Sequence, residues 1–198
     1  MKIIGITGGV GAGKSTVLHM LKELCNCRIV MADDEAKKLM NKGGALEDAA
    51  VRLFGLNAYR EDGTLNTGHI AEIFYKNPSK QQEWNNLVHP AVNNYIHNLI
   101  DETRKEGKFD YLFIEAALLI ENGYDSICDE IWYVYADADT RIKRLSNDRG
   151  YSKDKSVSIM KKQLSDEEFR KNCSFVIDTG MDLSYTRTIL KNRLEQYS

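Results

Sequence analysis

The chain has 198 residues, of which 42% are hydrophobic and 28% are charged, which is typical of a globular protein with one substantial core. Its formal net charge of -2 gives no global reason to expect nucleic acid or an anionic membrane surface as a partner. We find neither an apolar run of membrane-spanning length nor a signal-peptide pattern, so we expect a cytoplasmic protein whose oligomeric state stays open.

Five short apolar segments predict β-strands along the chain. Each is apolar on both faces, and helical patterns separate most of them, which is typical of a parallel sheet covered by helices on both sides. We therefore predict an α/β fold of three layers around a five-stranded parallel sheet. The predicted strands are 3–7, 28–32, 111–115, 131–135 and 174–177.

Two helical segments interrupt this alternation. Residues 34–108 contain helical patterns only and are too apolar for a disordered loop, so we predict a helical insertion there. Residues 139–172 form a second helical excursion rich in Lys and Arg, which we interpret as a lid. The core then comprises about 1–33, 109–138 and 173–198, and we expect all parts to fold as a single domain.

The loop after the first predicted strand carries the strongest chemical signal. Residues 8–15 read GGVGAGKS and match the phosphate-binding pattern G-x-x-x-x-G-K-[ST], the P-loop. A strand precedes it and an amphipathic helix follows, so a glycine-rich turn without a ligand is the weaker alternative. Lys14 would reach the β- and γ-phosphates of a nucleoside triphosphate, and the Ser15 hydroxyl would ligate Mg²⁺. The candidate nucleotide contacts are Gly8, Gly9, Gly11, Ala12, Gly13, Lys14, Ser15 and Thr16.

Acidic residues follow two predicted strands, at the sheet edge where open α/β folds bind their ligands. Asp33 follows the second strand and could accept the proton of an acceptor hydroxyl, although it or Asp34 could equally cap the next helix. Glu115 ends the third strand and is a candidate magnesium-side acid, with a carboxylate that faces solvent as the alternative. Glu121 is a weaker candidate.

Basic residues gather in the predicted lid. Arg141 and Arg144 lie three residues apart and share one helical face, and Arg149 follows them. An arginine there could neutralise charge that develops on a transferred phosphoryl group. The alternative is a solvated helix face paired with Asp137 and Asp139. A small P-loop fold with an insertion and a lid favours phosphoryl transfer to a small acceptor.

Cysteine and histidine show no metal-binding pattern. The four cysteines lack paired zinc spacing, so we interpret them as reduced structural thiols and expect no zinc. We expect the side chains of Cys25 and Cys27 to face opposite sides of the chain at the start of the second strand. His89 by itself has a structural interpretation, because the Pro90 beside it is typical of the start of a helix.

Several segments together resemble the dephospho-coenzyme A kinase family over nearly the whole chain. The phosphate-binding loop resembles the start of that family, and Asp33, between Ala32 and Ala36, matches the end of its D-A-D-x-x-A segment. The L-x-H-P motif of the family is matched by residues 87–90. Later matches in the same order are residues 118–121, Arg144 with Arg149, Gln163, 175–177 and Gly180.

This resemblance implies an enzyme of coenzyme A biosynthesis that uses ATP and Mg²⁺ to phosphorylate the ribose 3′-hydroxyl of dephospho-CoA. It implies that Asp33 activates the acceptor hydroxyl, that Lys14 and Ser15 serve the ATP phosphates and the metal, and that Arg144 or Arg149 is a lid arginine. The implied partners are these two small molecules, with no nucleic acid and no membrane. The residues assigned to the acceptor site are Asp33, His89, Glu115 and Leu118.

The chain departs from the family pattern at four positions. Met31, Thr67, Ala117 and Asp178 stand where an acid, an arginine, a proline and an asparagine are usual. The phosphate-binding loop and Asp33 are unaffected. Two alternatives stay open at this stage: a related small-molecule or nucleoside kinase, and a nucleotide-binding regulatory module without useful turnover.

Overall fold

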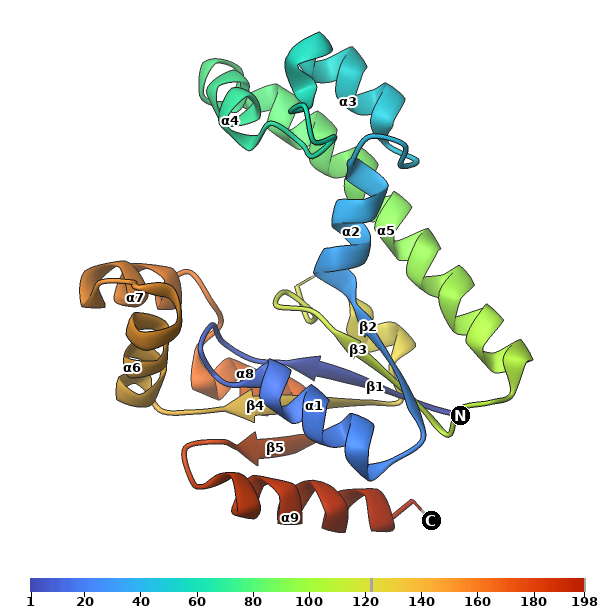
Figure 1. Cartoon of the computed structure of the whole chain (residues 1–198), viewed down its shortest axis with the longest axis vertical. Helices are drawn as coiled ribbons and strands as arrows, with labels where there is room; N and C mark the ends of the chain where they lie inside the picture. The colour runs from blue at the N-terminus through green and yellow to red at the C-terminus, as the bar shows by residue number, and fades with distance from the viewer. Residues whose placement is uncertain (122, 198) are drawn as a thin grey trace. The chain divides into compact units, whose positions relative to one another are not determined.

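The computed structural model describes residues 1–121 and 123–197. Two compact units make up the chain. The first, here called the core unit, comprises 1–30 and 106–198, and the second, the helical unit, comprises 31–105. Each unit has its own set of elements, which can be followed in Figure 1.

A five-stranded sheet forms the centre of the core unit, in the order β2-β3-β1-β4-β5. The central strand β1 pairs in parallel with β3 and β4, with Ile4 opposite Phe113 and Gly5 opposite Ile131. The prediction of an α/β fold with a five-stranded parallel sheet is confirmed. The strands are β1 Lys2–Thr7, β2 Cys27–Met31, β3 Tyr111–Glu115, β4 Glu130–Tyr135 and β5 Phe175–Asp178.

Helices cover this sheet because its strands are apolar on both faces. Trp132 and Phe113 are fully buried inside the sheet layers, and Phe169 is equally buried on the short helix α8, which packs on β4. Figure 1 shows α1 beside α9, and the two helices are in contact. The helices are α1 Lys14–Leu24, α6 Ala138–Arg149, α7 Lys153–Met160, α8 Asp166–Asn172 and α9 Leu183–Glu195, with a 3₁₀ turn η2 at Tyr124–Ile127.

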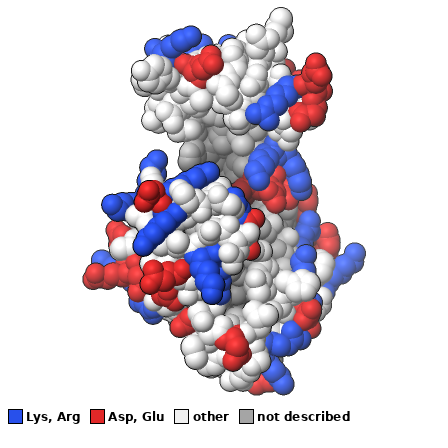
Figure 2. All heavy atoms as spheres, turned by 60° about the vertical axis from the view of Figure 1, so that its left-hand side comes forward, with Lys and Arg blue, Asp and Glu red and all other residues white. Residues whose placement is uncertain are grey.

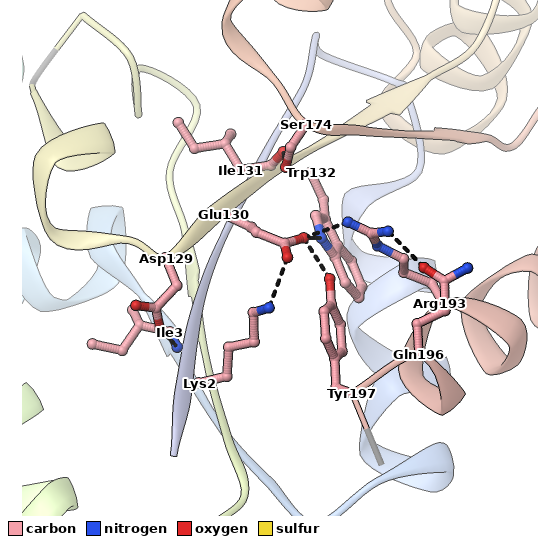
Figure 3. A network of polar contacts seen from close by, with 10 residues as sticks. All are labelled: Lys2, Ile3, Asp129, Glu130, Ile131, Trp132, Ser174, Arg193, Gln196 and Tyr197. Carbon is pink, nitrogen blue, oxygen red and sulfur yellow. Dashed lines mark hydrogen bonds and ion pairs between the residues drawn. The ribbon is translucent and has the colours of Figure 1, made fainter.

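Glu130, the first residue of β4, ties the amino end of the sheet to the C-terminal helix (Figure 3). Its carboxylate accepts hydrogen bonds from Lys2 at 2.7 Å, from Arg193 at 2.7 Å, from the Trp132 indole at 3.0 Å and from the Tyr197 hydroxyl. Burial alone would raise the pKa of Glu130, but these donors outweigh it and lower the pKa to about 2. The ion cluster therefore fixes α9 to strands β1 and β4.

The helical unit has a small core of its own. Phe54 lies at its centre and packs edge-on against Phe74 and Trp84, with ring centroids 5.6 and 5.1 Å apart. Its elements are α2 Ala32–Met40, α3 Glu47–Phe54, a 3₁₀ turn η1 Leu56–Ala58, α4 Thr67–Lys76 and α5 Pro78–Glu106.

Pro90 lies inside α5 and does not begin a helix, so the interpretation of His89-Pro90 as a helix start is wrong. Buried side chains on both sides of Pro90, including Trp84 and Ile96, keep the helix continuous, because packing outweighs the single lost hydrogen bond. Within the described residues, no helix has both the length and the apolar character that crossing a membrane requires.

Candidate functional site

The loop that joins β1 to α1 is shaped by glycines at positions where other residues would be strained. Gly13 precedes α1 with φ +94°, in the left-handed region. A side chain at Gly8 would place its Cβ 2.3 Å from the carbonyl oxygen of Val134 on the neighbouring strand. The backbone of this loop can therefore lie close to the sheet and leave its N–H groups at the N-terminus of α1 for an anion.

Lys14, the first residue of α1, is held between a loop carbonyl and a carboxylate. Its ammonium donates to the Gly8 oxygen at 2.8 Å and lies 3.5 Å from Oε1 of Glu115. Glu115 reaches this position because it ends β3 and pairs in register with Ile6 of β1. Only 6% of its side chain is exposed, so the alternative that Glu115 faces solvent is wrong.

Residues at the carboxyl ends of β1 and β3 and at the start of α1 carry oxygen groups of the kind that a hard divalent cation takes. Ser15 follows Lys14 with an exposed side chain, and Glu115 supplies a carboxylate. The hydroxyl of Thr7, the last residue of β1, is buried and makes no hydrogen bond to the described residues. Hydroxyl and carboxylate oxygens are the ligands that Mg²⁺ uses beside substrate phosphates, so these residues fit that ion. Within the described part of the chain, no cluster of three His, Cys, Asp or Glu side chains could hold a metal by itself.

Arg141 of α6 lies directly against the loop. Its Nε donates to the Val10 oxygen at 2.9 Å, and its terminal nitrogen donates to Gln163 at 2.8 Å. The same Gln163 oxygen accepts the Val10 N–H at 3.0 Å, so both backbone polar groups of Val10 are bound. Burial lowers the pKa of Arg141 from its usual value. The guanidinium of α6 and Gln163, which follows α7, thus hold one residue of the loop in place.

Arg144 makes a second clamp one helical turn further on. It donates to the Thr179 hydroxyl at 3.0 Å and to the Thr179 carbonyl at 2.6 Å, and it also contacts the carbonyls of Gly11 and Ala12. The Thr179 hydroxyl in turn donates to the Ala12 carbonyl at 2.6 Å. Thr179 directly follows β5, so its contacts join the carboxyl edge of the sheet to the loop.

These contacts overturn the solvated-face alternative for Arg141 and Arg144. Asp137, proposed there as a partner, instead caps α6 by accepting the N–H of Thr140 at 2.9 Å. Arg149, the last residue of α6, is exposed. Figure 2 shows acidic side chains interspersed with the Lys and Arg side chains on the face that carries α6 and α7, so this face is not uniformly basic.

Asp33 belongs to the helical unit, as the second residue of α2. The N-cap of α2 is Met31, and no side chain makes a capping hydrogen bond there, so the capping alternative for Asp33 and Asp34 is wrong. Asp34 forms an ion pair with Lys37 at 2.7 Å, whereas the side chain of Asp33 is exposed. Because β2 runs without a break into α2, Asp33 follows the strand end by two residues.

The other predicted acceptor residues divide between the two units. His89 is exposed on α5 in the helical unit. Leu118 follows β3 in the core unit with 48% of its surface exposed, while the neighbouring Leu119 is fully buried. Glu121, the weaker acidic candidate, is also exposed.

Thr179 is the residue of this site that sequence reasoning missed. The available signal was a hydroxyl directly after an apolar strand, at the edge where such sheets bind ligands. Asp178, one of the departures from the family pattern, closes the adjacent turn by accepting the Gly180 N–H at 2.8 Å.

Comparison with known proteins gives a consistent result. The family model described as dephospho-CoA kinase matches residues 2–184. The dephospho-CoA kinase of Dehalococcoides mccartyi is 34% identical and aligns over 98% of this chain and 99% of its own. The dephospho-CoA kinase of Carboxydothermus hydrogenoformans is 32% identical and aligns over 100% of this chain and 95% of its own.

Solved structures share the same architecture. A dephospho-CoA kinase from Campylobacter jejuni superposes with a TM-score of 0.71 at 22% identity and covers 100% of this chain and 98% of its own. A shikimate kinase from Acinetobacter baumannii, solved with shikimate, superposes with a TM-score of 0.54 at 16% identity and covers 99% of this chain and 94% of its own. At these identities both likenesses show the fold alone.

Proposed function

The chain belongs to the dephospho-CoA kinase family, and we propose which of its residues carry out the reaction of that family. The enzyme transfers the γ-phosphoryl group of ATP to the ribose 3′-hydroxyl of dephospho-CoA and releases coenzyme A and ADP. The observation that carries the residue assignment is the position of Lys14, held at the phosphate-binding loop between the Gly8 carbonyl and Glu115.

On the donor side, the loop and the first turn of α1 bind the triphosphate. Their backbone N–H groups and the positive end of the helix dipole face the phosphates, and Lys14 neutralises the β- and γ-phosphate oxygens. Arg141 and Gln163 keep the loop in shape from the lid through Val10. The contacts assigned to ATP are Gly8, Gly9, Gly11, Ala12, Gly13, Lys14, Ser15 and Thr16.

Ser15 and Glu115 are the residues that would hold Mg²⁺ beside the phosphates. Ser15 offers an exposed hydroxyl directly after Lys14, and Glu115 offers a carboxylate from the end of β3. When bound, the ion neutralises charge on the β- and γ-phosphates and on the departing ADP. Glu115 also orients Lys14, since the two side chains form an ion pair.

On the acceptor side, Asp33 takes the proton. As the ribose 3′-oxygen forms its bond to the γ-phosphorus, the bond from phosphorus to the β,γ-bridging oxygen breaks and ADP leaves with its electron pair. The proton of the 3′-hydroxyl passes to the Asp33 carboxylate, which is exposed and makes no cap to α2. His89 and Leu118, whose side chains are exposed, complete the proposed acceptor contacts.

Arg144 and Arg149 supply positive charge from the lid. Arg144 already lies at the loop through its contacts with Ala12 and Thr179, and Arg149 stands at the exposed end of the same helix. Either guanidinium would stabilise the charge on the phosphoryl oxygens during transfer. Both substrates are soluble small molecules, so the proposal needs neither nucleic acid nor membrane and places the enzyme in the cytoplasm.

An acceptor panel tests this assignment. Purified protein with ATP and Mg²⁺ is given dephospho-CoA, adenosine, AMP, shikimate or no acceptor, and ADP release and the phosphorylated product are measured. We expect release that depends on dephospho-CoA, with a product phosphorylated at the 3′-position. Turnover with another acceptor and none with dephospho-CoA would contradict the proposal.

A further inference from the structure

Two cysteines of the core unit lie together at the junction of α1 and β2, away from the phosphate-binding loop. The Sγ atoms of Cys25 and Cys27 both lie within hydrogen-bonding distance of the carbonyl oxygen of Leu21, at 3.3 and 3.7 Å. The expectation that these side chains face opposite sides is therefore wrong. Cys25 is extended, with φ −148° and ψ 161°, and Cys27 begins β2, and residues two apart in an extended segment share one face.

We propose that Cys25 and Cys27 are a reversible thiol–disulfide site, oxidised by small disulfides such as that of glutathione. Cys25 and Cys27 are two residues apart along an extended segment, so their Cα atoms are separated by about 6.6 Å. Disulfides span Cα separations of roughly 4.4–6.8 Å, so the pair can close near the long end of this range. A bridge at that limit is strained, and strained disulfides are the ones that reducing thiols reopen readily.

The pKa values of the two thiols shift in opposite directions, and the proposal gives each thiol a role on this basis. The hydrogen bond from Cys25 and the charge of Lys22 lower the pKa of Cys27 despite its partial burial. The same hydrogen bond, together with burial, raises the pKa of Cys25. Cys27 is therefore the attacking thiolate and Cys25 the thiol that closes the bridge. Cys173 offers a contrast within the chain, because burial raises its pKa to about 12.

Both thiols are partly exposed, and a surface hollow adjoins Cys25. Cys25 lines a hollow of about 960 Å³ at the amino ends of the strands, together with Asn26, Tyr111 and Lys191. Lys2 and Tyr197, both drawn in Figure 3, line the same hollow. Because the phosphate-binding loop follows the carboxyl end of β1, this hollow lies at the opposite edge of the sheet.

The exchange proceeds in two balanced steps. Cys27 loses its proton to solvent, its thiolate attacks one sulfur of glutathione disulfide, and one glutathione thiolate leaves and takes up a proton. Cys25 then loses its proton and attacks Sγ of Cys27, which expels the second glutathione as a thiol. Two protein S–H bonds are replaced by one S–S bond, and one glutathione disulfide is reduced to two glutathione molecules.

Mass spectrometry of the whole enzyme tests the proposal. The protein is equilibrated with increasing ratios of oxidised to reduced glutathione, quenched in acid, denatured and alkylated. Trypsin releases residues 23–28 as one peptide that contains both cysteines. We expect this peptide to lose two hydrogens and to resist alkylation in a fraction that rises with the ratio, while Cys128 and Cys173 are alkylated throughout. Dithiothreitol should restore alkylation of Cys25 and Cys27.

Single variants test the two roles separately. Cys25→Ser should stop at a glutathione adduct on Cys27, and Cys27→Ser should react with glutathione disulfide several-fold more slowly. Cys173→Ser is the matched control and should close the bridge as the unaltered chain does. Persistence of the alkylated 23–28 peptide at ratios that oxidise a reference dithiol would overturn the proposal. An adduct on the unaltered chain that never closes would also overturn it, and equal rates for the two variants would overturn the assignment of Cys27 as the nucleophile.

Discussion

The ammonium of Lys14 lies 3.5 Å from the carboxylate of Glu115, and the side chains are 14% and 6% exposed. The two residues come from distant parts of the chain, since Lys14 begins α1 and Glu115 ends β3, the strand that pairs with β1. A buried charge that loses its partner is costly, so each group depends on the other in the protein without ATP. This pairing makes the donor site sensitive to changes at either residue.

Lys14→Ala should abolish most phosphoryl transfer. The variant loses the charge at the β- and γ-phosphates and the ion pair with Glu115, so we expect kcat to fall by about 10²–10³-fold, as when one transition-state contact is removed. Steady-state ADP release with dephospho-CoA measures the change. Lys22→Ala, on the same helix, should keep normal kcat. A Lys14→Ala kcat within a few-fold of the unaltered enzyme, with a normal melting temperature, would exclude the assigned role.

Glu115→Gln should increase the Mg²⁺ concentration that the enzyme needs. The amide keeps the shape of the side chain but removes the negative charge that would hold the ion and that pairs with Lys14. We expect the activation curve for Mg²⁺ to move to several-fold higher concentrations. Glu121→Gln, at an exposed position, is the matched control. Identical Mg²⁺ curves for the two variants would show that Glu115 does not serve the metal.

Asp33→Asn should lower turnover while ATP binding persists. A general base contributes about 10²–10⁴-fold, so we expect a fall of that size in kcat and little change in the Kd of ATP, measured by calorimetry. Asp34→Asn is a close control, because Asp34 is the next residue and forms only an exposed ion pair with Lys37. Equal kcat values for the two variants would reject Asp33 as the base.

Arg144→Lys should weaken ATP binding although the positive charge is retained. Lysine cannot reproduce the fork that bonds the hydroxyl and the carbonyl of Thr179 together, so the loop loses one of its two clamps. We expect a several-fold rise in the KM for ATP and a lower melting temperature. Arg149→Lys, at the exposed end of α6, should leave the melting temperature unchanged. An unchanged KM in Arg144→Lys would show that its charge alone matters.

The sheet and the phosphate-binding loop were predictable because their signals are local. A buried parallel strand is a continuous apolar run, and the predicted strand at 111–115 coincides with β3. The clamps on the loop were not predictable, because they depend on contacts between distant residues. Gln163 and Val10 are 153 positions apart, and Thr179 reaches Ala12 across 167.

Two errors have equally physical causes. Pro90 predicted a helix start from its local propensity, but side chains buried on both sides of it hold α5 continuous. Cys25 and Cys27 were assigned to opposite sides, although the strand period of two places them on one. Local propensity is overridden by packing in the first case, and the periodicity was misapplied in the second.

Stability should fall in acid through Glu130, whose carboxylate joins Lys2, Arg193 and Tyr197 (Figure 3). Its pKa is about 2 in the folded chain against an ordinary 4.5, so the stabilisation is fully present above 4.5 and is lost as the pH falls toward 2. A shift of this size corresponds to about 3 kcal/mol.

Urea unfolding of Glu130→Gln should show a deficit of roughly this size in the free energy of unfolding at neutral pH, and this deficit should narrow in acid. Glu195→Gln, which removes an exposed ion pair with Lys191 on α9, should cost less than about 1 kcal/mol. A deficit for Glu130→Gln that does not change with pH would mean that packing, and not the charge of Glu130, fixes α9 to the sheet.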